Sequence, residues 1–71
     1  MKDKDFLKQI GQNIIRIRKK KGWTTKELGY QCDIEKSNLI PIEKGRINVT
    51  ATTLLKIATA LDVEVQEFFK S

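Results

Sequence analysis

The side chains with the most evident chemistry in this sequence are cations, which could bind an anionic partner. The 71 residues include 14 Lys and Arg against 9 Asp and Glu, giving a net charge of +5 and a pI near 9.6. Residues 1–31 hold nine cations and three acids, a balance of +6, whereas residues 32–71 hold five and six, a balance of −1. The positive charge therefore belongs to the first part of the chain, and it favours an anionic partner.

Patterns typical of catalysis or metal binding are missing from the sequence. It has no histidine, no nucleophile paired with a base and no glycine-rich phosphate loop, so no enzymatic activity is expected. Cys32 is the single cysteine, which rules out an internal disulfide and argues against a zinc site; we expect neither a cofactor nor a metal. Cys32 falls on an apolar face, where a small buried hydrophobe is expected rather than a reactive thiol, which needs exposure and nearby cations.

The length and hydropathy limit the organisation of the chain. Seventy-one residues suit one small domain, residues 1–71, whose modest core supports only a few kcal/mol of stability. No apolar run approaches the ~18 residues of a membrane helix, and no signal peptide is evident. We therefore expect a cytoplasmic protein without a membrane partner.

A long helix is predicted at the start of the chain. Apolar residues at 6, 10, 14 and 17 follow at steps of four, four and three, which places them on one helical face ending near Lys20, with Gly22 as the stop. Residues 1–5 are expected to be frayed, or else to form the polar first turn of this helix. The cations at 16 and 18–21 either complement the helix dipole or contact phosphates, and both interpretations remain open.

Two short helices around a tight corner are predicted over residues 25–44. Thr24 followed by Glu27 is a capping box, in which each side chain can satisfy a free amide at a helix start, so a helix should begin at Thr25. Gly29 is small enough to let two helices approach closely. The apolar positions at this corner are Leu28, Cys32, Ile34, Leu39 and Ile42. This pattern packs one short helix across another.

Two more helices are predicted after this corner. Thr50 can cap a helix whose inward residues would be Leu54, Leu55, Ala58 and Leu61. Residues 66–70 can form a short fifth helix, which completes an all-α fold. The apolar residues near this end either seal the core or form a dimer surface; they are Val63, Val65, Phe68 and Phe69.

Together these features resemble the Cro and phage-repressor (XRE-type) family of helix-turn-helix DNA-binding domains. The resemblance covers roughly residues 10–69 and includes Ile10-Gly11, the series Ile14, Ile17 and Arg18, Gly22 before the cap, residues 42–45, and residues 54–58 leading into Leu61. It implies a compact five-helix lambda-repressor-like fold in which the second helix of the pair enters the DNA major groove. It further implies a transcriptional regulator of the repressor type, which binds double-stranded DNA as a homodimer on an inverted repeat and is associated with the nucleoid when bound.

The resemblance also implies which residues touch DNA. Base contacts fall to Lys36, Ser37, Asn38, Ile40 and Pro41. Phosphate contacts fall to Thr25, Lys26, Lys44, Gly45 and Arg46. Lysine can donate to guanine, asparagine can pair with adenine and isoleucine can pack on a thymine methyl. For Ser37 and Asn38, capping of the helix start is an equally good interpretation.

Two further residue roles have open alternatives. In the family, Arg18 and Glu43 make a largely buried ion pair; the alternative is two independent surface charges. Trp23, directly before the threonine cap, is expected to plug the apolar interior, although an exposed tryptophan could instead stack on a base.

Four positions depart from the family pattern. Thr25 stands where the family often has glutamine, Glu35 places a negative charge near the expected phosphates, and Asp33 occupies a corner of positive φ where glycine is preferred. Pro41 lacks an amide donor, a penalty of ~3 kcal/mol inside a helix, so we expect the second helix to start late or to bend near Ser37.

Because fold does not fix function, the alternative to a DNA-binding regulator is a protein-interaction module on the same scaffold, such as an antitoxin or coactivator component.

Overall fold

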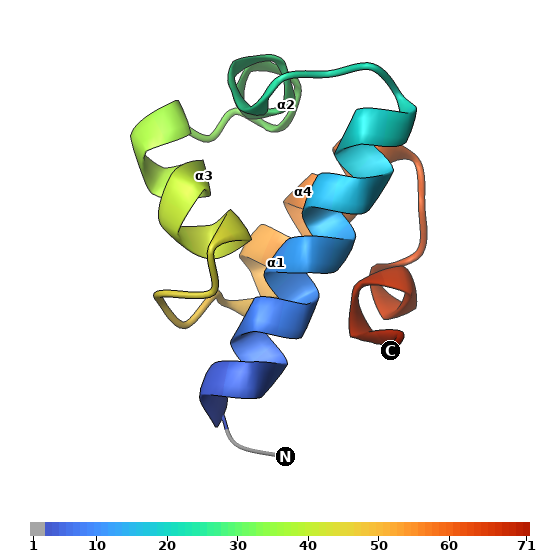
Figure 1. The fold of residues 1–71 in the computed structure, drawn as a ribbon. Helices are drawn as coiled ribbons and strands as arrows, with labels where there is room; N and C mark the ends of the chain where they lie inside the picture. The colour runs from blue at the N-terminus through green and yellow to red at the C-terminus, as the bar shows by residue number, and fades with distance from the viewer. Residues whose placement is uncertain (1–2) are drawn as a thin grey trace.

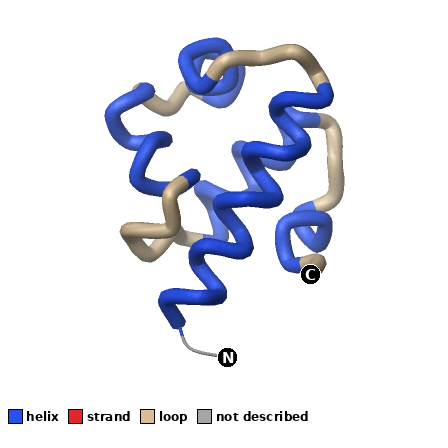
Figure 2. Tube along the Cα trace, viewed as in Figure 1, coloured by secondary structure: helices blue, strands red, loops and turns tan. Residues whose placement is uncertain are grey.

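The computed structural model describes residues 3–71, and within that range every regular element is helical (Figures 1 and 2). The elements are α1 (Asp3–Lys20), α2 (Thr25–Cys32), α3 (Lys36–Glu43), α4 (Ala51–Leu61) and the 3-10 helix η1 (Val65–Phe69). The predicted all-α fold with five helical elements is confirmed, with the difference that the fifth is a 3-10 helix. No helix in residues 3–71 is long and apolar enough to span a membrane.

Helix α1 includes the polar residues at the start of the chain and ends where expected. Asp3–Asp5 are helical, so the polar first turn is confirmed for them and the alternative of a frayed start is wrong; the acids in this turn complement the helix dipole. Residues 1 and 2 lie outside the described range. At the other end, Gly22 adopts φ +77°, and the Trp23 amide donates to the Arg18 carbonyl at 3.2 Å. This closing pattern, which needs a left-handed residue, confirms Gly22 as the stop.

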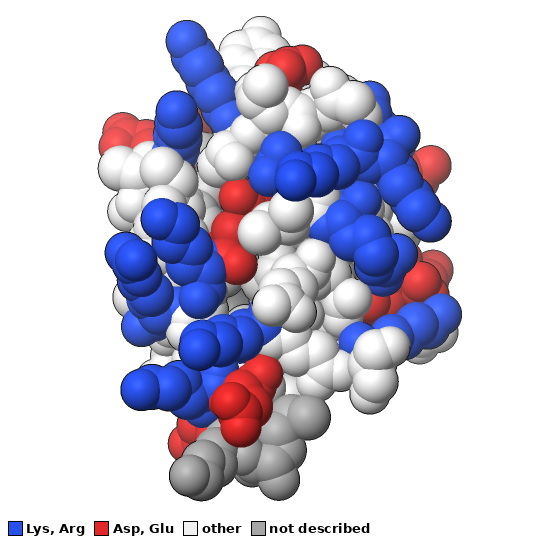
Figure 3. All heavy atoms as spheres, in the orientation of Figure 1, with Lys and Arg blue, Asp and Glu red and all other residues white. Residues whose placement is uncertain are grey.

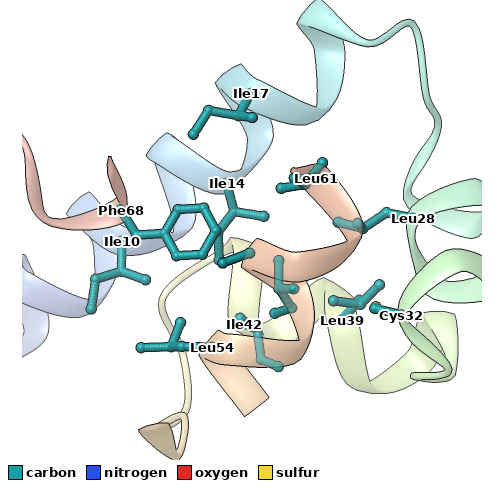
Figure 4. Close-up of a cluster of buried hydrophobic side chains, with 12 residues drawn as sticks. Ile10, Ile14, Ile17, Leu28, Cys32, Leu39, Ile42, Leu54, Leu61 and Phe68 are labelled. Atoms are coloured by element: carbon teal, nitrogen blue, oxygen red, sulfur yellow. The ribbon is translucent and has the colours of Figure 1, made fainter. Parts of the chain in front are cut away.

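The core is built on residues from every helix (Figure 4). Ile14, Leu28, Ile57 and Leu61 are fully buried within it. Leu55 was predicted to face inward, but 56% of it is exposed. The buried residues of α4 are 54, 57, 58 and 61, the i, i+3, i+4, i+7 stripe of a helix, and position 55 lies beside that stripe.

The two adjacent phenylalanines near the C-terminus have different environments. Phe68 is fully buried and Phe69 is 42% exposed, with its ring stacked on Phe6 at 5.8 Å between centroids. The Asn13 amide anchors this segment to α1 by donating to the carbonyls of Phe68 (2.9 Å) and Lys70 (2.7 Å). The assignment of Phe68 to a dimer surface is therefore wrong, because its ring seals the core.

A close backbone contact fixes α3 against α1. Gly11 lies so near the end of α3 that a Cβ there would clash with the carbonyl of Glu43 and lie 2.8 Å from that of Ile42. Gly45, just after α3, adopts φ +70°, and a Cβ on it would lie 2.6 Å from the Lys8 Cα. The two helices are thus held together at backbone distance by glycine on each side.

Candidate nucleic-acid interface

The corner between α2 and α3 forms as the sequence predicts. The Thr24 hydroxyl accepts from the Glu27 amide (3.1 Å), and the Glu27 carboxylate accepts from the Thr24 amide (3.2 Å), so α2 begins at Thr25. Asp33 takes the left-handed conformation at φ 57°, and the next amide, of Ile34, donates to the Gly29 carbonyl at 2.9 Å. The predicted capping box and the predicted positive-φ corner are both confirmed.

Helix α3 starts at Lys36, so the prediction of a late start near Ser37 is wrong. Glu35 is the N-cap, and its carbonyl accepts from the amides of residues 38 and 39 at 2.9 and 3.0 Å, which closes the first turn. Pro41 is therefore in the helix interior and offers no amide to the Ser37 carbonyl. The fully buried Leu39 holds the helix in place, because tertiary packing supplies most helix stability in proteins.

The amino-terminal turn of α3 presents polar side chains that the fold leaves free. Lys36, Ser37 and Asn38 are exposed, and their side chains make no hydrogen bond within residues 3–71. No side chain caps α3, which removes the capping interpretation of Ser37 and Asn38. Ile40 and Pro41 are half-buried further along the helix. Their role as base contacts stays a prediction.

The residues expected to hold phosphates divide into two groups. Lys26, Lys44 and Arg46 are exposed and form no ion pair within the described part of the chain. Thr25 is half-buried, and its hydroxyl donates to Glu43 Oε1 at 3.0 Å, which leaves its backbone amide in the first turn of α2 for a phosphate.

The phosphate contact expected through Gly45 is contradicted. Gly45 is buried, and its amide already donates to the Ile42 carbonyl at 3.1 Å. Its positive φ and its closeness to α1 explain why glycine stands there. Gly45 therefore shapes the turn, and its amide is not available to bind a phosphate.

A buried ion pair lies behind the exposed surface of α3. Arg18 Nε lies 2.8 Å from Glu43 Oε2, with 10% and 6% of the two side chains exposed. Arg18 also donates through Nη1 to the Trp23 carbonyl at 2.7 Å. Together with the bond from Thr25, the pair joins the last residue of α3 to the first of α2 and to α1. Its role is structural, because it fixes the angle between the two short helices.

Comparison with known proteins identifies the family. Residues 14–68 match the helix-turn-helix family model HTH_3. The chain belongs to that family. The uncharacterized HTH-type transcriptional regulator y4dJ of Sinorhizobium fredii is 37% identical over 59 residues, which cover 83% of this chain and 77% of that protein. These matches confirm the predicted XRE-type resemblance.

Two further proteins match most of this chain. The immunity repressor protein of Bacillus phage phi105 is 36% identical over 56 residues, covering 79% of this chain and 39% of the repressor. The crystal structure of the restriction-modification controller protein C.AhdI from Aeromonas hydrophila has a TM-score of 0.85 at 35% identity, covering 89% of this chain and 96% of that one. The fold described above is therefore that of a helix-turn-helix regulator.

Trp23 and Cys32 both pack against the apolar interior, Trp23 partly buried and Cys32 buried. Trp23 is half-buried against the core, with Lys21 Nζ 5.4 Å from the ring centroid, so it acts as the predicted plug. Cys32 is 6% exposed, and burial raises the pKa of its thiol. A high pKa keeps the thiol protonated and unreactive, so Cys32 behaves as the predicted small hydrophobe.

The structure also groups cations that the sequence did not bring together. An open groove of about 900 Å³ lies between α1 and the turn after α3, and Lys4 and Lys8 face Lys44 and Arg46 across it. In Figure 3, Lys and Arg atoms continue from the side of α3 toward the amino end of α1. The i, i+4 spacing of the two lysines was a signal for a shared face. The spacing has this meaning only if Lys4 is helical, and the sequence leaves a frayed start open for residues 1–5.

Proposed function

We propose that this helix-turn-helix domain binds duplex DNA sequence-specifically and represses transcription as a homodimer on an inverted repeat. The observation that carries the proposal is the amino-terminal turn of α3, where Lys36, Ser37 and Asn38 are exposed and unbonded within residues 3–71. An α-helix fits the major groove of B-form DNA, and its first residues reach the base edges in domains of this kind. Free polar groups at that end of α3 are what base reading requires.

The side chains on α3 can discriminate bases by their chemistry. Lys36 can donate to the O6 and N7 acceptors of guanine, and Asn38 can pair bidentately with adenine. The half-buried Ile40 can offer apolar contact to a thymine methyl. Each good contact of this kind contributes ~1 to 3 kcal/mol of discrimination against a wrong base.

Cations on both sides of α3 would position it on the DNA backbone. Lys26 lies in the first turn of α2, and Lys44 and Arg46 follow the end of α3. All three are exposed and unpaired in the part of the chain that the structure describes. Phosphate contacts at these places would fix the register of α3 while leaving sequence choice to its own side chains.

Dimerisation would double the length of DNA sequence that is recognised, because each α3 reads only one short half-site. The predicted apolar side chains left for it are Phe69, which is 42% exposed and stacked on Phe6, and the half-buried Val63 and Val65. A two-fold dimer would place two α3 helices about one DNA turn, ~34 Å, apart, and would read an inverted repeat. A phage immunity repressor and a restriction-modification controller protein are among the similar proteins, which supports a role in gene control. We place that role on the nucleoid in the cytoplasm.

Salt-dependent binding separates this proposal from the protein-interaction alternative. A duplex-DNA binder that contacts several phosphates loses affinity linearly on a log–log plot of binding constant against salt, with a slope of about −0.9 per contact. Selection from a random duplex pool should also return an inverted repeat. If the protein binds neither random nor selected duplex at 50 mM salt, the DNA proposal fails and the interaction module is supported.

A further inference from the structure

We propose that the groove between the amino-terminal half of α1 and the turn after α3 is a second DNA-backbone site, in which Lys4 and Lys8 bind phosphodiesters beyond the reach of the helix-turn-helix. This inference rests on the proposed DNA binding and extends it to residues of α1. The groove measures about 900 Å³ and is open to solvent, so it is larger than a single phosphate needs. A length of polymer backbone is a better match for it than a small anion.

The donors on the α1 side form one row. Lys4, Lys8 and Gln12 follow at intervals of four residues, all three are exposed, and all three line the groove. Neither lysine forms an ion pair within residues 3–71. On the opposite side, Lys44 and Arg46 are equally unpaired. Cations therefore face the groove from two segments far apart in the sequence.

The single acid lining the groove is already neutralised. Both carboxylate oxygens of Glu43 are engaged, Oε2 by Arg18 at 2.8 Å and Oε1 by the Thr25 hydroxyl at 3.0 Å, and the residue is 6% exposed. Four cationic side chains thus remain without a counter-charge in the groove. Such a concentration of one sign favours an anionic ligand, and bound backbone phosphates would supply it.

The two walls of the groove are rigidly connected. A Cβ on Gly45 would lie 2.6 Å from both the Lys8 Cα and the Lys8 nitrogen, so the turn after α3 rests directly on the backbone of α1. The Arg46 amide donates to the Pro41 carbonyl at 2.9 Å, which ties the same turn to α3. The backbone of α1 that carries these lysines is thereby held against the turn after α3. DNA that binds α3 in its major groove could then contact Lys4 and Lys8 without a conformational change in the protein.

The apolar part of the lining also suits a nucleic-acid backbone. Leu7 and Ile15, both half-buried, line the groove between the cations. They can pack against deoxyribose while the surrounding amines and guanidinium hold the phosphates. Continuity with Lys44 and Arg46, which flank α3, favours DNA over an acidic peptide as the occupant.

The test compares Lys8→Gln and the double variant Lys4→Gln/Lys8→Gln with Lys56→Gln. Lys56 is an exposed lysine on α4 that does not line the groove, so its change matches the helical context and the loss of charge. Binding to random duplex and to a selected operator is measured from 50 to 300 mM salt. Each lost contact should make the log–log slope shallower by about 0.9 and lower affinity roughly tenfold at 0.1 M salt. Relative preference among operators should stay unchanged, since phosphates carry no sequence information.

Phosphate-ethylation interference adds a positional measurement. The unmodified protein should show interference at phosphates that the double variant no longer reads, whereas the Lys56→Gln pattern should equal that of the unmodified protein. A slope and an interference pattern that match those of Lys56→Gln would overturn the inference. Altered base preference in the double variant would also overturn it. Absence of any salt-dependent binding by the unmodified protein would instead refute the proposed function itself, so the two failures are distinguishable.

Discussion

Helices α2 and α3 are each eight residues long, but α2 is capped by side chains and α3 is not. At α2, the Thr24 and Glu27 side chains satisfy each other's amides, and the left-handed Asp33 ends the helix. At α3, Glu35 is an N-cap whose side chain makes no capping bond, and Pro41 interrupts the interior hydrogen bonds. Local chemistry therefore specifies α2, whereas α3 depends on its contacts with the rest of the fold.

The difference has a functional meaning. A polar side chain that caps its own helix is not free to contact a partner, because its hydrogen-bonding groups are already used. In α3 the exposed side chains of Ser37 and Asn38 make no capping hydrogen bond. The helix is held in place on its inner side by the buried Leu39 and Glu43. The fold stabilises α3 on its inner side and leaves its outer side available for recognition. Each prediction below changes one side of this comparison.

The largest effect is expected from breaking the ion pair that joins the two helices. Arg18→Met leaves the Glu43 carboxylate buried without a charged partner, which should destabilise the fold by about 3 to 5 kcal/mol. Adding Glu43→Leu to the same chain should recover much of that loss. Denaturant melts measure both variants. A loss below ~0.5 kcal/mol in the single variant would show that the pair behaves as an exposed one.

The next effect concerns the proline inside α3. Pro41→Arg restores an amide that can donate to the Ser37 carbonyl, and the difference in helix propensity is ~3 kcal/mol. Replacing proline also makes the unfolded chain more flexible, which lowers this gain by ~0.4 to 1 kcal/mol. We therefore expect the free energy of unfolding to rise by about 2 kcal/mol in thermal or denaturant melts.

The same substitution adds a cation on the proposed DNA-facing helix. Pro41→Arg should therefore also raise DNA affinity, and Pro41→Ala serves as the control that restores the amide without the charge. Equal stability of Pro41→Arg and the unmodified chain would mean that α3 accommodates the proline at no cost.

The smallest effect is expected from substitutions at the N-caps of α2 and α3. Thr24→Ala removes the bond from the Glu27 amide and should cost about 1 kcal/mol, whereas Glu35→Ala, at a cap without a side-chain bond, should change stability by less than ~0.5 kcal/mol. Glu35→Ser should stabilise α3 by supplying the missing cap. Chemical denaturation of all three variants decides the matter. Equal losses for Thr24→Ala and Glu35→Ala would remove the contrast between the helices.

Local signals explain which parts of the fold were predictable from sequence. The Thr24 capping box, the Gly22 stop and the Asp33 corner each depend on residues within a few positions, and each was predicted correctly. The start of α3 was not, because the local penalty of Pro41 is outweighed by burial of Leu39 in a core that residues of all the helices form together. The residues next to Pro41 in the sequence do not indicate how much stability this burial contributes.

The remaining errors have the same origin. Phe68 and Phe69 are adjacent and identical in type, and the ring that is buried belongs to a segment anchored by Asn13, 55 residues away. The groove residues Lys8 and Arg46 come from distant segments that meet at a glycine contact. The resemblance implies a phosphate contact for Gly45, whereas its burial follows from the contact with the α1 backbone at Lys8, 37 residues earlier in the chain.

The central claim is that the free amino-terminal turn of α3 reads bases while the cations flanking it hold phosphates. Binding-site selection on a random duplex pool, carried out with the unmodified protein and with Lys36→Ala, Lys44→Ala and Arg46→Ala, tests it most directly. Lys36→Ala should lose ~1 to 3 kcal/mol of discrimination at one or two positions of each half-site, whereas the other two should weaken all sequences alike. Identical relative preferences before and after the Lys36 change would contradict the claim.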